Sequence, residues 1–119
     1  LDADRLIDLV LQMVRSALNK RGELSLERMA ARLSTSEGAI LAALRLLQAR
    51  GLIELTRVDE GYFTVRRGTN IENPAMLERA RANVVLQLKE VDAFRRIWES
   101  DAPAALLAAV RAVGSDVAS

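Results

Sequence analysis

Apolar residues recur every three or four positions at the start of the chain, and this spacing predicts an amphipathic helix over residues 2 to about 19. Asp2 and Asp4 lie near its predicted start, whereas Lys20 and Arg21 follow its end. This is the order of charge that the helix dipole favours. The apolar face of the predicted helix comprises Leu6, Ile7, Val10, Leu11, Met13, Val14 and Leu18.

A short second helix is predicted after Gly22, which ends the first one. Ser25 is the predicted N-cap, because its hydroxyl can accept a hydrogen bond from a free amide of the first turn. We expect this helix to run to about Leu33. Its predicted inner face comprises Leu26, Met29, Ala30 and Leu33.

The hydroxyl residues at 34–36 separate the second helix from a third, predicted over about residues 37 to 50. We expect Ser36 to cap this third helix, although Ser34 with Glu37 would also form a capping box. The inward positions of the third helix are predicted to be Ile40, Leu44 and Leu47.

The apolar period changes from 3.6 to 2 after Gly51, a glycine that ends the third helix in the left-handed conformation. Residues 52–58 and 62–66 alternate as strands do, and the polar residues Asp59, Glu60 and Gly61 form the predicted turn between them. A β-hairpin is therefore expected directly after the third helix.

A long helix is predicted to begin at Asn73-Pro74, where asparagine caps and proline occupies the first turn. If it continues to Trp98 it is about 37 Å long. A last short helix is predicted over residues 103–113. The predicted fold class is thus mainly α with a small β-hairpin. The apolar stripe of the long helix comprises Leu77, Val84, Leu88, Val91, Phe94 or Ile97, and Trp98.

Residues 28–53 resemble the helix-turn-helix of the winged-helix superfamily. The shared features are small alanines where two helices cross, a Ser/Thr turn at 34–36, and a closing Gly51-Leu52-Ile53 that leads into a strand. The resemblance covers residues from about 5 to 67. It implies a winged-helix domain over residues 1–70, with residues 71–119 as a helical extension packed on it.

In that superfamily the second helix of the motif enters the major groove with its N-terminal residues at the base edges. The positions predicted to face outward here are Glu37, Gly38, Leu41, Ala42, Arg45 and Gln48. Only Arg45 could make a bidentate contact with guanine, and Gln48 adds one amide. The resemblance therefore implies a poor surface for reading sequence.

Three arginines at the base of the predicted wing could contact a DNA backbone: Arg57, Arg66 and Arg67. The alternative is that they are solvated charges of the hairpin. The wing tip carries Asp59 and Glu60, which oppose a phosphate contact.

The composition excludes several classes of chemistry. The chain of 119 residues contains no cysteine and no histidine, so it offers no disulfide, zinc finger, thiol nucleophile or histidine base. We expect no catalytic site, no metal site and no cofactor. A cysteine-free chain fits a reducing cytoplasm, and the apolar runs are too short to span a bilayer. Leu1 is not an initiator methionine, so we expect a piece of a longer protein.

The formal net charge is +1, from 17 basic and 16 acidic residues. A domain that depends on phosphate contacts is usually more basic, so we expect any DNA binding to be weak.

A partner-binding groove is predicted between the long helix and the last helix, with an apolar floor and a cationic rim. An acidic, hydrophobic-ended peptide, such as the tail of a single-strand-binding protein, would suit it, as would a docking surface for a helicase. The alternatives are that Trp98 belongs to the core and that Glu90, Asp92 and Glu99 make this a mixed solvated face. The predicted partner-binding residues are Lys89, Arg95, Arg96, Trp98 and Arg111.

A second resemblance concerns the part of the chain after the wing. Residues 61–67, followed by residues 77–96 and a leucine-rich segment, resemble C-terminal modules of bacterial recombination and repair enzymes, the RecJ-type exonucleases and RecQ-type helicases. The zinc cysteines of the RecQ-type proteins are missing here. This resemblance implies a non-catalytic module of a larger DNA-processing enzyme. The alternatives are a free-standing dimeric transcriptional regulator, whose long terminal helix pairs with its mate, and a winged helix that only binds protein.

Overall fold

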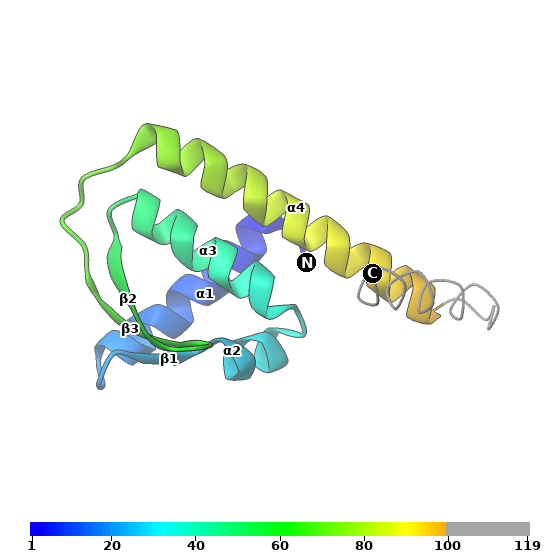
Figure 1. The fold of residues 1–119 in the computed structure, drawn as a ribbon, viewed down its shortest axis with the longest axis horizontal. Helices are drawn as coiled ribbons and strands as arrows, with labels where there is room; N and C mark the ends of the chain where they lie inside the picture. Colours follow the sequence, from blue (N-terminus) through cyan, green and yellow to red (C-terminus); the bar gives the residue numbers. More distant parts are fainter. Residues whose placement is uncertain (100–119) are drawn as a thin grey trace. The chain divides into compact units, whose positions relative to one another are not determined.

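The computed structural model describes residues 1–99, apart from the side chains of Trp98 and Glu99. In this part of the chain the fold is mainly helical with a small antiparallel sheet, as predicted (Figure 1). The predicted helix over 103–113 lies outside the described residues. The elements are α1 (Ala3–Leu18), β1 (Glu23–Ser25), α2 (Leu26–Leu33), α3 (Glu37–Ala49), β2 (Ile53–Asp59), β3 (Tyr62–Arg67) and α4 (Pro74–Glu99).

Short polar side chains fix the helix starts. The hydroxyl of Ser25 accepts from the amide of Arg28 at 3.3 Å, and that of Ser36 accepts from the amide of Ala39 at 3.0 Å. These bonds satisfy amides that have no partner inside the helix, and they confirm both predicted caps. Asn73 likewise accepts from the amide of Met76 at 3.2 Å, which confirms the start of α4.

Ser34 does not cap α3. It closes α2 instead, in the left-handed conformation with φ of 52°, so the alternative capping box with Glu37 is wrong. The left-handed residue turns the chain sharply between the two helices, which a cap of α3 with extended backbone could not do.

The sheet has three strands in the order β1-β3-β2, one more than predicted. β1 pairs antiparallel with β3, with Leu24 opposite Phe63. A three-residue strand is too short to show a period of two in the sequence. Gly22 brings this strand close to β3: its carbonyl accepts from the amide of Val65 at 2.8 Å, and a Cβ at Gly22 would lie 2.6 Å from the Val65 carbonyl oxygen.

The β2–β3 hairpin turns at Glu60 and Gly61, where Gly61 has φ of 75°. A bulge between Arg57 and Asp59 interrupts the register, and Val58 within it is exposed. Such bulges protect a sheet edge against pairing with other strands. The turn is held on α2 by a hydrogen bond from the amide of Leu26 to the Gly61 carbonyl, 2.9 Å long.

The core lies between α1, α3 and the inner face of the sheet. Its fully buried large side chains come mostly from α1 and α3, and no polar or charged side chain of the described residues is buried. Aliphatic side chains thus provide nearly all of the packing, since aromatic residues make up only 3% of the chain. The largest fully buried side chains are Leu6, Val10, Val14, Ile40, Leu44, Leu46, Leu47 and Val84.

Residues 74–88 of α4 cover α3. Figure 1 shows α4 running alongside α3 in the opposite direction, and a Cβ at Gly38 would lie 2.5 Å from the side chain of Gln87. The connecting segment is bonded to the end of α3, because Asn70 donates to the Gly51 carbonyl and Asn73 to the Ala49 carbonyl, both at 2.8 Å. Leu77, Ala80, Val84 and Leu88 complete the core.

The chain divides into two compact units, Leu1–Leu88 and Lys89–Ser119. The first half of α4 therefore belongs to the same unit as α1–α3 and the sheet. The predicted boundary near residue 70, between a winged-helix domain and a helical extension, stays a prediction. None of the helices in residues 1–99 is both long and apolar enough to cross a membrane.

Candidate functional site

Helix α3 is buried on all sides except one strip. We call Glu37, Gly38, Leu41, Arg45 and Gln48 the α3 strip. They fall within roughly 100° of the helix circumference, at 100° per residue. Glu37, Gly38 and Arg45 are exposed, and Leu41 and Gln48 are half-buried.

The predicted outward position of Ala42 is wrong, because its side chain is only 1% exposed. Residues 74–88 of α4 lie along that side of α3. The apolar pattern of the third helix predicts packing on one side only, whereas α4 covers a second side and narrows the surface that α3 exposes to solvent.

The cationic and amide groups of the α3 strip are bonded to each other. The Nη1 atom of Arg45 donates to Oε1 of Gln48 at 3.0 Å. A bidentate contact between Arg45 and a guanine would compete with this bond. The strip therefore presents one cation that already has a neutral partner, together with the carboxylate of Glu37 at its N-terminal end.

Acidic groups gather at the hairpin turn and at the N-terminal end of the α3 strip. The Oε1 atom of Glu37 lies 3.6 Å from the position of a Cβ at Gly61, so this carboxylate is beside the hairpin turn. Asp59 and Glu60 are exposed at the same turn. This local negative charge disfavours the approach of a phosphate backbone.

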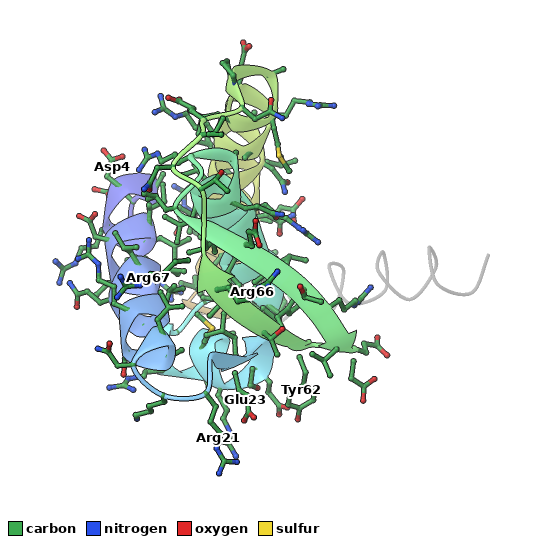
Figure 2. The ribbon with its side chains drawn as sticks, turned by 90° about the vertical axis from the view of Figure 1, so that its left-hand side faces the viewer. Asp4, Arg21, Glu23, Tyr62, Arg66 and Arg67 are labelled. Carbon is green, nitrogen blue, oxygen red and sulfur yellow. The ribbon has the colours of Figure 1, made fainter. Side chains whose placement is uncertain are left out.

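The three arginines predicted at the wing base do not form one cluster. Arg66 pairs with Glu54 across the hairpin at 3.0 Å, with side chains 76% and 48% exposed. Figure 2 shows Arg66 over the front of the hairpin and Arg67 beside α1, as alternation along a strand requires. Arg57 shares the face of Arg67 but lies four positions along the ladder, about 13 Å away.

The residues predicted to bind a partner lie at the end of α4 where they are described. Lys89 and Arg96 are exposed and Arg95 is half-buried. Lys89 and Arg96 are seven residues apart and share a face with Asp92, so charge on that face is mixed. The side chain of Trp98 and all of Arg111 lie outside the described residues, and the predicted groove stays a prediction.

A groove between α1, β1 and α2 was missed by the sequence analysis. It has a volume of about 450 Å³. Its floor is apolar, from Met13, Ala17, Leu24 and Met29, and its rim carries Lys20, Arg28 and Arg32, with Tyr62 at one end. We call this surface the α1–α2 groove. Its lining residues come from several separate elements of the chain, so no local sequence motif indicates it.

A second groove lies on the opposite side of α1. Its volume is about 360 Å³, and it is lined by apolar residues of α1 and β2 together with Arg15 and Arg67. Arg67, predicted for DNA, is therefore at a groove beside α1, away from the α3 strip.

Within residues 1–99, no group of three or more carboxylate, histidine or cysteine side chains is placed to hold a metal ion. Comparisons with family models, with curated proteins and with solved structures give no match to this chain.

Proposed function

We propose that this chain is a non-catalytic winged-helix module of a larger bacterial enzyme of DNA recombination or repair, and that it docks a protein partner and binds DNA weakly. The order of elements supports the winged-helix part of the proposal. Helices α2 and α3 are joined by a tight turn at residues 34–36, and the β2–β3 hairpin follows α3 directly. This is the helix-turn-helix and wing arrangement that the sequence resembles.

The single observation that carries the weak binding is the composition of the α3 strip. A recognition helix places the residues of its N-terminal part against base edges. Here that part carries Glu37 and Gly38, and the one cation further along, Arg45, is bonded to Gln48. A free-standing regulator must read an operator, and this strip offers it one possible base contact.

A module inside a larger enzyme needs less affinity of its own, because the tether raises the effective concentration of DNA and of partner near it. The partner is a protein: the tail of a single-strand-binding protein or a docked helicase. Its predicted contacts at the end of α4 are Lys89, Arg95, Arg96, Trp98 and Arg111.

The test is a titration of the purified chain with duplex DNA at several salt concentrations. We expect micromolar or weaker binding at physiological salt. The slope of log affinity against log salt should be about 2–4 in magnitude, because each neutralised phosphate contributes about 0.9. A sequence-specific footprint at nanomolar concentration would contradict the proposal and favour a regulator.

One observation favours that alternative, a dimeric transcriptional regulator. Val85 and Leu86 on α4 are 44% and 52% exposed, and a second copy of the chain could cover them. Sedimentation equilibrium distinguishes the two functions. A module is expected to remain monomeric at micromolar concentration, whereas a regulator should dimerise and lose its dimer on Leu86→Lys.

A further inference from the structure

The floor of the α1–α2 groove is built from side chains that pack on the core. Leu24 and Met29 are buried, and Met13 and Ala17 are partly buried against the same core. The groove is therefore a fixed feature of the folded unit of residues 1–88. Its volume of about 450 Å³ lies in the range of small ligand pockets, so one or two side chains of a partner would fit it. Methionine side chains adapt to ligands of different shape.

Cations from α2 and from the turn after α1 line the groove beside this floor. Arg28 and Arg32 are four residues apart on α2 and so lie on one face of that helix, while Glu27 and Ala31 lie on another. Lys20 reaches the groove from the turn after α1. The two arginines repel each other at this spacing, and a bound anion would relieve that repulsion.

Lys20, Arg28 and Arg32 have no carboxylate partner among the residues that the structure describes. None of them forms an ion pair with an acidic side chain of residues 1–99, in contrast to Arg66, which is paired with Glu54. The lining contains a single carboxylate, that of Glu23. Figure 2 shows Glu23 near Tyr62 at the end of the sheet. Tyr62 is 53% exposed, and its hydroxyl can donate to an incoming carboxylate.

We propose that the α1–α2 groove is the docking site for an acidic peptide segment of a protein partner, one that carries an apolar side chain next to its carboxylates. The apolar side chain lies on Met13, Leu24 and Met29. The carboxylates lie against Lys20, Arg28 and Arg32. This inference rests on the proposed docking function and assigns it a surface other than the end of α4.

The apolar floor selects a peptide over a nucleic acid. A phosphate backbone satisfies the cations but has no aliphatic group for the floor, and the single aromatic ring at the groove cannot stack successive bases. An acidic peptide with an apolar residue uses both parts of the surface, because burial of the apolar group adds to the charge complementarity.

The test uses the full chain and a pool of fluorescein-labelled hexapeptides with Asp or Glu at four positions and Leu or Phe at the other two. Binding is followed by fluorescence anisotropy. We expect the pool to bind, and a matched pool with Asn and Gln in place of the acids to bind at least about tenfold more weakly. The variant Arg28→Ala/Arg32→Ala should weaken binding of the acidic pool by about tenfold or more.

Arg5→Ala/Arg79→Ala is the matched control. It removes the same charge from exposed positions outside the groove, so affinity should stay within about twofold. Met13→Ser should also weaken binding, because it removes apolar floor while the cations remain. Circular dichroism confirms that each variant is folded.

Four outcomes would overturn the inference. The acidic pool could fail to bind the unaltered chain, or the control could lose as much affinity as the groove variant. If only Arg95→Ala/Arg96→Ala lowered the affinity for the acidic pool, the chain would still dock a peptide, but at the end of α4. If Arg28→Ala/Arg32→Ala lowered affinity for duplex DNA and left the peptide pool unaffected, the groove would be a nucleic-acid contact. The titration with duplex DNA at several salt concentrations tests separately whether the chain is a weakly DNA-binding module.

Discussion

The α3 strip and the α1–α2 groove both expose arginine side chains, and they differ in what surrounds those side chains. On the strip, Arg45 is bonded to Gln48, and the carboxylate of Glu37 lies at the helix start. In the groove, Arg28 and Arg32 have no acidic partner in the described residues and lie beside an apolar floor. In the proposed winged helix the strip would be the recognition surface, yet it offers few groups for base contacts. The groove, on another side of the fold, combines these cations with apolar side chains.

The comparison shows why net charge is a poor guide to the partner of a small domain. The whole chain has a formal charge of +1, which on its own predicts no preference for acidic ligands. The local balance of charge decides which ligand a surface prefers, because exposed charges more than about 8 Å apart are largely screened at physiological salt. A ligand in the groove would therefore sense its three cations and the carboxylate of Glu23, and not the carboxylates elsewhere on the chain.

The largest loss of stability is expected from a substitution on the buried side of α3, because most residues of this helix belong to the core. Leu44→Ala should lower the free energy of unfolding by about 2–5 kcal/mol, through lost apolar burial and the cavity left behind. Urea denaturation followed by circular dichroism measures this. Leu41→Ala, at a half-buried position of the strip, is the control and should cost clearly less. Equal costs would mean that the strip is as closely packed as the core.

A second large loss of stability is expected from a substitution where the end of α3 contacts the segment that leads into α4. Gly51 has φ of 77°, and a Cβ there would lie 2.5 Å from backbone atoms of Ile71. Gly51→Ala should therefore destabilise the fold by more than the cost of the left-handed conformation alone, which is about 1–2 kcal/mol.

Gly61→Ala provides the matched control for that substitution. Gly61 has φ of 75°, and its nearest neighbour would be a side-chain oxygen of Glu37 at 3.6 Å. Only the conformational cost of about 1–2 kcal/mol is then expected. If thermal denaturation gave the same loss for both variants, the connecting segment would not hold α4 against α3.

The smallest effect is expected from the ion pair on the hairpin. Arg66→Ala should change the free energy of unfolding by about 0–1 kcal/mol, because Arg66 and Glu54 are largely exposed and solvent screens their attraction. Its effect on DNA affinity should also be small, since the arginine is already paired. A tenfold loss of duplex affinity in a filter-binding assay would show that the wing contacts phosphate and would weaken the contrast with the groove.

Most of the secondary structure follows from local signals in the sequence. Ser25, Ser36 and Asn73 each accept a hydrogen bond from an amide three residues later, so the sequence within one turn determines these helix starts. Gly51 and Gly61 similarly mark positions of positive φ.

The features that the sequence analysis missed depend on residues distant in the chain. β1 exists through its pairing with β3, some forty residues later, and Ala42 is buried by a helix that begins at Pro74. The groove likewise joins α1, β1, α2 and Tyr62. Such features follow from tertiary packing, which cannot be deduced from the spacing of apolar residues or from the helix-capping residues. The sequence did identify the residues of the α3 strip, because that conclusion required only the periodicity of one helix. The weak DNA binding inferred from these residue types stays a prediction.

The central claim is that the partner-binding surface of this module is the α1–α2 groove and not the α3 strip. Heteronuclear NMR titrations of the labelled full chain, with the acidic hexapeptide pool and with duplex DNA in parallel, test it most directly. The account predicts that the peptides shift the amide signals of residues 13–32 and Tyr62 in a saturable way. It predicts that DNA gives only small, salt-sensitive shifts. Saturable shifts of Leu41, Arg45 and Gln48 with DNA, together with unchanged signals at residues 13–32 with peptide, would contradict it.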